Sequence, residues 1–273
     1  IRRHSQAPLV YYGHELHYRR LEDEARVNGS EAASREAQPM QRLERDVWRR
    51  VDVVLYPSEE EAAHVRALEP GTDARAISPY AFDAVSQPES AGGRQGALFV
   101  AGFAHPPNVD AAEWLVREVM PLVWREAPEV RLALVGANPS ERVRALGDER
   151  VEVTGYVSDE ELEQRYAAAR VAVVPLRFGA GVKNKVVEAM RYGVPLVTTG
   201  VGAQGLPGLE ATATIADTAE GVAEGMLALL HDDVRWVEAS RAGTQYVRER
   251  FSRAAMRNTL VDALGIARSR GPA

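Results

Sequence analysis

A cluster of cations, glycines and one carboxylate between positions 177 and 188 has the composition of an anion-binding site. Its members are Arg177, Gly179, Gly181, Lys183, Lys185 and Glu188. Glycines let backbone N–H groups approach a phosphate closely, a helix N-terminus carries about half a positive charge, and lysine and arginine side chains add full charges. We therefore expect this segment to bind a diphosphate.

A buried strand should precede the cluster, and a helix should carry its second half. Residues 171–176 (VAVVPL) form a continuous apolar run, which is typical of a strand covered on both faces in a parallel sheet. Ligands bind at the carboxyl ends of such strands. One cation there could be an ordinary solvated charge, and Lys185 could point outward, but three cations within nine residues favour a binding role. For Glu188, the helix dipole alone offers a structural explanation worth about 0.3–1 kcal/mol.

The segment from Arg177 to Gly205 resembles the donor-binding signature of the group 1 (family 4) glycosyltransferases. The matching residues are Arg177, Gly179, Gly181, Lys183, Lys185, Glu188, Ala189, Met190, Gly193, Pro195 and the glycine-rich stretch 200–205. The resemblance covers about residues 95–250 and is weaker upstream. It implies the GT-B fold, an α/β architecture of two Rossmann-like domains facing each other across a cleft, the second being a complete parallel sheet with helices on both faces. It also implies sugar transfer from a nucleotide diphosphate donor, with retention at the anomeric carbon and without a metal or other cofactor.

The resemblance also implies roles for individual residues. Arg177 and Lys183 would act as catalytic residues that stabilise the leaving diphosphate, and Glu188 would hold the ribose diol of the nucleotide. Further donor contacts are expected from Lys185 and from the backbone of Gly179, Ala180, Gly181, Val182, Tyr156 and Val157.

Two departures from the family pattern concern this site. Many members carry two glutamates separated by seven residues, and the position of the first is Ala180 here. The loop 102–108 (GFAHPPN) lacks the arginine and lysine that many members place after the first strand of this domain. We expect Asn108 in that loop to cap the next helix, with a ligand contact as the alternative.

His14 is the catalytic candidate on the acceptor side, with Glu15 beside it. In the family a histidine or acid of the corresponding loop approaches the transferred sugar, whereas packing beside Tyr12 and Tyr18 is the structural alternative. His14 and His17 lie three residues apart, and because no third ligand is evident we expect no metal site.

Composition and the resemblance together divide the chain into four parts. We expect a partial acceptor-side Rossmann-like domain at 1–85, a linker rich in Gly, Pro and Ser at 86–96, the donor-binding domain at 97–250, and a terminal helix at 251–273 that returns to the first domain. The first domain is expected to be incomplete at its N-terminus, because the sequence starts without methionine.

The periodicity of the sequence predicts the elements of both domains. In the first we expect a short buried strand at 8–12, a helix at 39–50, and a mobile connection between two helices at 28–37, where small polar residues dominate. Ser58 and Glu61 have the spacing of a capping box. From residue 97 onward strands and helices alternate, which predicts a parallel sheet with right-handed crossovers.

Bulk composition excludes several classes of function. The chain has 273 residues, 45% of them hydrophobic, a net charge of −6 and no cysteine. The acidic balance gives no reason to expect nucleic acid as a partner. The lack of cysteine removes disulfides, thiolate chemistry and Cys-ligated zinc, and is typical of the cytoplasm. No run approaches the ~20 apolar residues of a membrane span, so we expect no integral membrane segment, while peripheral membrane contact stays open.

Three functions are open at this level. The first is a glycosyltransferase that acts on an unidentified glycan, lipid or small-molecule acceptor. The second is a GT-B nucleotide-sugar epimerase, and the third is a catalytically silent nucleotide-sugar binding module, which Ala180 and the incomplete first domain would suit.

Overall fold

The computed structural model describes residues 8–78, 80–86 and 90–264, and these form two compact units. The first unit contains the described residues of Ile1–Ala81, Gly179–Val182 and Arg250–Ala273, and the second contains those of Phe82–Phe178 and Lys183–Glu249. Residues 1–7, residues 87–89 of the expected linker and residues 265–273 of the expected terminal helix lie outside the described residues.

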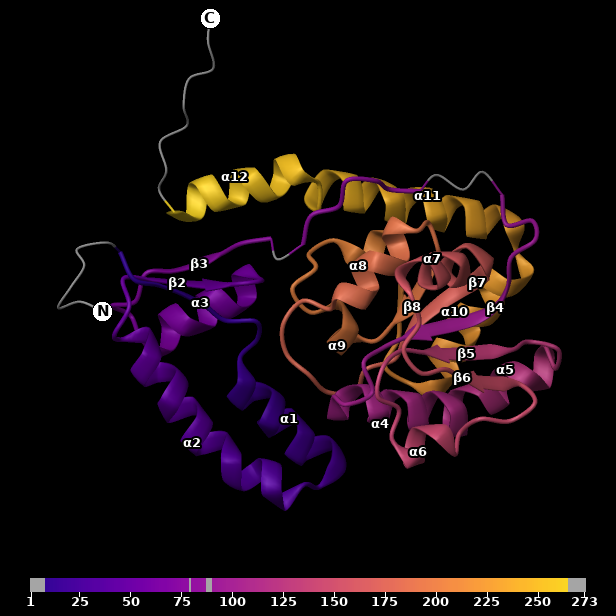
Figure 1. Cartoon of the computed structure of the whole chain (residues 1–273), viewed down its shortest axis with the longest axis horizontal. Coiled ribbons are helices and arrows are strands. Elements are labelled where there is room, and N and C mark those ends of the chain that lie inside the picture. The colour runs from indigo at the N-terminus through magenta and orange to yellow at the C-terminus, as the bar shows by residue number, and fades with distance from the viewer. Residues whose placement is uncertain (1–7, 79, 87–89, 265–273) are drawn as a thin grey trace, which may run out of the picture. The chain divides into compact units, whose positions relative to one another are not determined.

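The second unit is built on a six-stranded, fully parallel sheet (Figure 1). Its strands are β4 (Gln95–Val100), β5 (Leu132–Val135), β6 (Val151–Val153), β7 (Ala169–Val174), β8 (Leu196–Thr198) and β9 (Thr214–Ile215). They are ordered β6-β5-β4-β7-β8-β9, with Ala97 of β4 lying between Leu132 of β5 and Val171 of β7. Every residue of β7 is buried, as its apolar run predicts.

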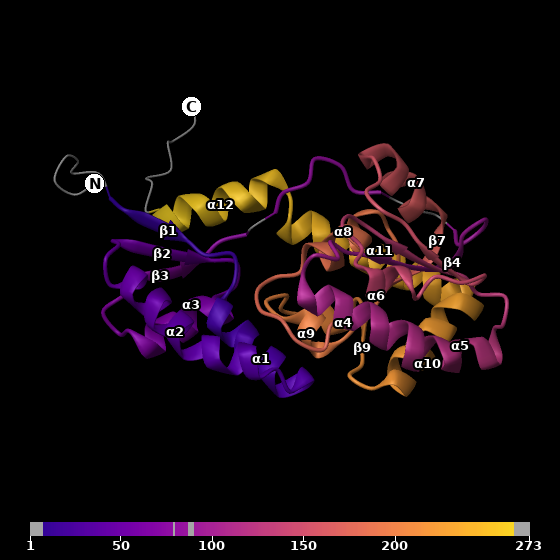
Figure 2. The same ribbon diagram turned by 60° about the horizontal axis from the view of Figure 1, so that its bottom comes forward.

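Helices cover both faces of this sheet, which confirms the predicted Rossmann-like architecture. The longer connections are α4 (Pro106–Trp114), a π-helical segment (Leu115–Val119), α5 (Met120–Glu126), α7 (Asp159–Ala168), α8 (Asn184–Arg191), α10 (Ala219–His231) and α11 (Asp233–Arg250). Short turns of helix are α6 (Glu141–Arg144), α9 (Gly200–Ala203) and a 3₁₀ segment (Leu209–Ala211). Figure 2 shows α7 and α8 on one side of the sheet and α4, α5 and α10 on the other, and α10 packs against α5.

Side-chain caps explain where several of these helices begin. The hydroxyls of Ser140, Ser158, Thr199 and Thr218 each accept a backbone N–H three residues later, at the starts of α6, α7, α9 and α10. Such caps satisfy N–H groups that the first turn of a helix leaves unpaired, so the helix starts are encoded locally.

The first unit holds a smaller parallel sheet with strand order β1-β2-β3. Its elements are β1 (Val10–Tyr12), α1 (His17–Asn28), α2 (Glu31–Trp48), β2 (Val53–Tyr56), α3 (Glu59–Leu68), β3 (Ala74–Ala76) and α12 (Arg253–Leu264). The buried side chains of Trp48, Tyr56 and Val65 lie in its core, where the Trp48 indole N–H donates to the Tyr56 hydroxyl at 3.3 Å.

The terminal helix α12 packs within the first unit. The Arg75 guanidinium on β3 donates to the carbonyl of Ala263 at 2.5 Å, and the backbone N–H of Ser78 donates to Thr259 Oγ1 at 3.3 Å. Figure 2 shows α12 on the opposite side of the three-stranded sheet from α2 and α3.

Two predictions for the first unit are wrong. Residues 28–37 are mostly helical, because α1 ends at Asn28, Gly29 adopts a left-handed φ of 64°, and Ser30 caps α2 by accepting the Ala33 N–H at 3.2 Å. A two-residue turn with good caps therefore replaces the predicted mobile connection. Strand β1 is not buried as predicted, since Val10 and Tyr12 are 40% and 37% exposed.

The capping box at the start of α3 is confirmed, since the Glu61 N–H donates to Ser58 Oγ at 3.2 Å. Among the described helices, none combines the length and the apolar character that a membrane-spanning segment requires.

Candidate anion-binding site

The cationic cluster lies where the strand order reverses, that is, between the strand from which the chain moves toward one edge of the sheet and the strand from which it moves toward the other. From β4 the chain proceeds outward through β5 to β6, then returns to form β7 on the other side of β4. In open parallel sheets ligands bind beside the carboxyl ends of the two strands at such a reversal. The segment after β7 carries residues 177–188, and the segment after β4 carries the loop 102–108.

Lys185 points inward and joins these two segments. Its Nζ donates to Oδ1 of Asn108, on α4, at 2.7 Å. Burial, with a smaller contribution from the positive charge of Lys183, lowers the pKa of Lys185 to about 8. The alternative in which Lys185 points outward is wrong. Lys185 is a partly desolvated cation whose ammonium lies at the strand reversal, where the attraction of an anion is little screened by water.

Lys183 occupies the cap position of α8. The side chain is 9% exposed, and its Nζ donates to Oε1 of Gln204, which follows α9, at 3.3 Å. Because α8 lacks a side-chain cap, the positive end of the helix dipole adds to the two lysine charges. Two ammonium groups and a helix N-terminus make this a region of positive potential suited to a diphosphate.

A carboxylate balances the charge of Arg177. Its Nε donates to Oδ2 of Asp110 at 2.9 Å, and its Nη2 bonds the other carboxylate oxygen. This bidentate bond raises the pKa of Arg177 above its usual value. Asp110 lies on α4 and is only 8% exposed, so the pair ties the segment after β7 to the helix after β4.

The prediction that Asn108 caps α4 is wrong. The helix starts at Pro106, and His105 occupies the cap position. Proline favours the first turn of a helix, because its fixed φ is helical and its missing N–H would be unpaired there. Asn108 consequently lies inside the first turn, where its Nδ2 donates to the Gly102 carbonyl at 2.8 Å while its Oδ1 accepts from Lys185.

Glu188 lies on α8, one turn after Lys185. Its Oε2 accepts a hydrogen bond from the hydroxyl of Tyr166 at 3.4 Å. Burial raises the pKa of the Glu188 carboxyl, while the charge of Arg191 and the Tyr166 hydroxyl lower it. The carboxylate keeps free acceptor capacity, because each of its oxygens can accept two hydrogen bonds.

Tyr156 and Val157 lie at the same edge of the sheet, directly after β6. The Tyr156 side chain is 81% exposed, and the segment ends where Ser158 caps α7. The Thr154 hydroxyl donates to the Gly155 carbonyl at 3.0 Å, which shapes the turn before Tyr156. The segment from which we expect backbone contacts to a base therefore lies between β6 and α7.

Gly179, Ala180, Gly181 and Val182 group with the first unit, unlike the rest of the cluster. Gly181 has a φ of 72°, and a Cβ added to it would lie 2.7 Å from the carbonyl oxygen of His14. The carbonyl of Val182 accepts a hydrogen bond from the Tyr80 hydroxyl at 3.2 Å. Only glycine combines this backbone conformation with so close an approach of two backbones.

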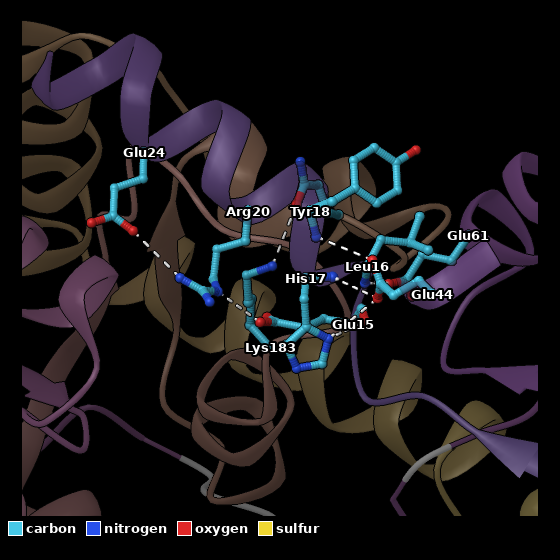
Figure 3. A network of polar contacts seen from close by, with 10 residues as sticks. Glu15, Leu16, His17, Tyr18, Arg20, Glu24, Glu44, Glu61 and Lys183 are labelled. Carbon is cyan, nitrogen blue, oxygen red and sulfur yellow. Dashed lines mark hydrogen bonds and ion pairs between the residues drawn. The ribbon is translucent and has the colours of Figure 1, made fainter. Parts of the chain in front are cut away.

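His14 is exposed, and its ring contacts that of Tyr12 edge to face with centroids 5.0 Å apart. The next residue, Glu15, accepts a hydrogen bond from Arg20 Nε at 2.9 Å, and Arg20 also reaches Glu24 at 3.4 Å (Figure 3). The arrangement leaves the His14 imidazole exposed to solvent while Glu15 is tied to α1.

Two buried carboxylates hold the backbone that follows His14. Oε1 and Oε2 of Glu44 accept the N–H groups of His17 at 3.0 Å and Tyr18 at 3.2 Å, and Glu61 accepts that of Leu16 at 3.2 Å (Figure 3). Glu44 and Glu61 are 4% and 5% exposed. They serve as caps for α1, whose own cap residue supplies none. A hydrogen bond to Glu44 is also the main cause of the raised pKa of His17.

Among the described residues, no three histidine, aspartate or glutamate side chains gather to hold a metal ion. A pocket of about 790 Å³ lies at the amino ends of β4, β5 and β6, lined in part by Gln95, Arg131 and Glu152. This is the edge opposite the cationic cluster, and ligands of open parallel sheets bind at the carboxyl edge. We therefore place the candidate site at the cluster and not in this pocket.

Two contributors to the site, Asp110 and Tyr166, are not predicted from the sequence, and Gln204 is predicted only as part of the matching stretch 200–205. Each lies far along the chain from the residue it contacts, or on a separate element, so no local pattern marks the contact. One feature of the composition marks the two lysines of the site. Lys183 and Lys185 are the only lysines in the sequence, among 33 lysine and arginine residues in total.

The two lysines permit a direct test of the lowered pKa. Lysine labelled with ¹³C at Cε is expected to give two NMR signals, of which one titrates with a midpoint near pH 8, because burial disfavours the charged form of Lys185. The Lys185→Arg variant assigns the signal, and the urea-unfolded chain supplies the reference near 10.4. A Lys185 signal that titrates at the reference value contradicts the inward position of its ammonium.

Comparisons with known proteins give a consistent family and fold. The family model described as "Glycosyl transferases group 1" matches residues 94–232, which is 139 of the 273 residues. A Klebsiella pneumoniae protein, described as an uncharacterized 44.6 kDa protein in the cps region, is 29% identical over 115 residues, covering 40% of this chain and 30% of that protein. The chain thus matches less than a third of that relative's length.

Solved structures of low sequence identity share the fold. Sucrose-phosphate synthase from Thermosynechococcus elongatus has a TM-score of 0.75 at 23% identity, covering 97% of this chain and 69% of that one. HepE from Anabaena, solved with UDP and glucose, has a TM-score of 0.68 at 16% identity, with coverages of 96% and 72%. A UDP-forming α,α-trehalose-phosphate synthase from Burkholderia vietnamiensis has a TM-score of 0.71 at 10% identity, with coverages of 97% and 71%. These likenesses agree with the GT-B fold expected from the sequence.

Proposed function

The chain belongs to the group 1 glycosyltransferases, and we propose that it transfers a glycosyl group from a nucleoside diphosphate sugar to an acceptor hydroxyl. The observation that carries this proposal is the pair of ammonium groups, Lys183 and Lys185, beside the open N-terminus of α8 at the strand reversal. The donors of relatives support it, since HepE was solved with UDP and glucose and the trehalose-phosphate synthase is UDP-forming.

The proposed reaction places the developing negative charge at the lysines. The bond between the anomeric carbon and the diphosphate oxygen breaks with its electron pair staying on the diphosphate, while the acceptor oxygen bonds to the same face of the carbon. The acceptor proton passes to the departing phosphate oxygen. Lys183, Lys185 and the α8 N-terminus stabilise the diphosphate as its charge increases, which lowers the barrier without a metal ion.

The other predicted residues take supporting roles in this proposal. Arg177, which bonds Asp110, fixes the segment after β7 to α4 and adds its positive charge near the diphosphate. Glu188 accepts the ribose hydroxyls, and the backbone of Tyr156 and Val157 meets the base. His14 approaches the transferred sugar. Backbone groups of residues 179–182 do the same, which compensates for the absence of an acid at position 180.

Turnover of radiolabelled donors tests the proposal. UDP-glucose, UDP-N-acetylglucosamine, GDP-mannose and ADP-glucose are each incubated with the protein and a mixture of glycan, lipid and small-molecule acceptors, with and without EDTA. We expect release of the nucleoside diphosphate from one donor, unaffected by EDTA and strongly reduced in Glu188→Ala. ¹H NMR of the product reports whether the anomeric configuration is retained.

The outcomes separate the alternatives. Binding of a nucleotide without transfer or hydrolysis of any donor indicates a silent binding module. Conversion of the donor into an epimeric sugar indicates an epimerase. Absence of nucleotide binding overturns the proposed site altogether. The lack of cysteine is compatible with activity in the cytoplasm, where thiols stay reduced.

A further inference from the structure

A buried tyrosine that the proposed reaction does not use contacts the Glu188 carboxylate. Tyr166 lies near the end of α7 and its side chain is 1% exposed. Its hydroxyl donates to Glu188 Oε2 at 3.4 Å. A buried phenol hydroxyl requires a hydrogen-bond partner, and hydrogen bonds of active sites are often long before the ligand is present. Tyr166 is therefore in place to restrict the rotamer of Glu188.

The ring of Tyr166 is itself held by an aromatic stack. It lies against Tyr192, which follows α8, with centroids 4.7 Å apart and planes inclined by 16°. The Tyr192 hydroxyl donates to Glu163 of α7 at 3.3 Å. The two tyrosines thus pack α7 against α8, but only the hydroxyl of Tyr166 reaches Glu188. Tyr192 therefore serves as a control, because it shares the ring stack but its hydroxyl bonds Glu163 instead of Glu188.

The segment proposed to meet the base directly precedes the same helix. Helix α7 begins directly after Val157 and Ser158, and Tyr166 lies at its other end. A single rigid element accordingly links the base segment to the carboxylate. Arg191 and Asp159 are the charged groups that act on Glu188, and the Arg191 guanidinium lies over the ring of Tyr192 at 4.8 Å, so it belongs to the same packed layer.

The number of acceptor positions on Glu188 defines what it can recognise. A carboxylate has about four lone-pair positions, and the Tyr166 hydroxyl occupies one of those on Oε2. The remaining positions on the two oxygens suit two adjacent hydroxyl groups. A ribose presents such a pair at its 2′ and 3′ carbons, whereas a 2′-deoxyribose presents only one.

We propose that Tyr166 is a positioning residue that fixes Glu188 for the ribose diol, so that the preference for a ribonucleoside over a 2′-deoxyribonucleoside diphosphate depends on the Tyr166 hydroxyl. The inference rests on the proposed function. It adds a residue on α7 to the site. A site built to bond a hydroxyl discriminates strongly against the analogue that lacks it, because buried acceptors are then left unpaired.

The test compares ribonucleotides with their deoxy analogues. Calorimetry gives the dissociation constants of UDP, GDP and ADP and of the corresponding 2′-deoxynucleoside diphosphates for the wild type, Tyr166→Phe, Tyr192→Phe and Glu188→Gln. We expect the wild type to prefer the ribonucleotide by about tenfold or more. Tyr166→Phe should reduce this preference severalfold while keeping the ring stack. Tyr192→Phe should leave it unchanged, and Glu188→Gln should remove most of it.

A double variant shows whether Tyr166 acts through Glu188. If it does, Tyr166→Phe combined with Glu188→Gln has the same preference as Glu188→Gln alone, because the two effects are not additive. A purely structural role predicts instead that both tyrosine variants lower the melting temperature and neither changes the preference. That result overturns the inference while leaving the proposed function intact. The same holds if the wild type binds ribonucleoside and 2′-deoxyribonucleoside diphosphates equally. A wild type that binds none of the nucleotides overturns both.

Discussion

Replacing Lys183 by methionine is expected to weaken the binding of the matching nucleoside diphosphate by about 10- to 100-fold. Methionine keeps most of the aliphatic stem but removes a charged donor from a side chain that is 9% exposed. The loss is large because a charge-assisted bond to phosphate in a partly desolvated site is little screened by water. Lys185→Met should produce a loss of the same order, since its ammonium lies at the same strand reversal. Titration calorimetry measures both.

A cation outside the site provides the control for general electrostatics. Arg125 is an exposed residue of α5, and Arg125→Met changes the net charge of the protein by the same amount. Its dissociation constant should stay within about twofold of the wild type, because exposed charges at a distance are screened by salt. Equal losses in Arg125→Met and Lys183→Met would show that net charge alone decides binding. Unchanged affinity in both lysine variants would place the diphosphate elsewhere.

Replacing Glu44 by alanine is expected to lower the free energy of unfolding of the first unit by about 2–4 kcal/mol. Both oxygens of this carboxylate are used, because they accept the N–H groups of His17 and Tyr18 at 3.0 and 3.2 Å. The substitution leaves these buried donors unpaired and removes packing volume from a side chain that is 4% exposed. Hydrogen exchange followed by mass spectrometry should show faster exchange in the peptide that contains the start of α1.

Glu36 is the matched control, since it lies on α2 like Glu44, is exposed and also carries one negative charge. Glu36→Ala should change stability by less than about 0.5 kcal/mol and leave the exchange of the α1 peptide unaltered. If Glu44→Ala behaves in the same way, the buried carboxylate does not cap α1. Because the capped segment follows His14 directly, Glu44→Ala is also expected to reduce turnover more than donor affinity. We propose that donor affinity depends instead on the lysines of the second unit.

Apolar runs and the alternation of strands and helices predict the fold of the second unit correctly. The buried run at 171–176 predicted β7, and the alternation of strands and helices predicted the parallel sheet that the structure confirms. The predictions of residues 28–37 and of Asn108 are wrong because local signals compete there. The polar residues 28–37 suggested a mobile connection, yet the Ser30 cap and good helix formers extend α2. At Asn108 two prolines start the helix earlier than the expected cap.

The sequence by itself determined the elements and the identity of the charged groups, because caps, glycine conformations and apolar runs depend on neighbours within a few residues. Only the tertiary structure decided which of those charges are available to a ligand. Arg177 and Asp110 are 67 residues apart in sequence, and Lys185 and Asn108 are 77 apart. These pairs form because β7 returns to lie beside β4, which brings two separate loops to one edge of the sheet. Strand order, a long-range property, thus balances the charge of Arg177 with a carboxylate and pairs Lys185 with a neutral amide.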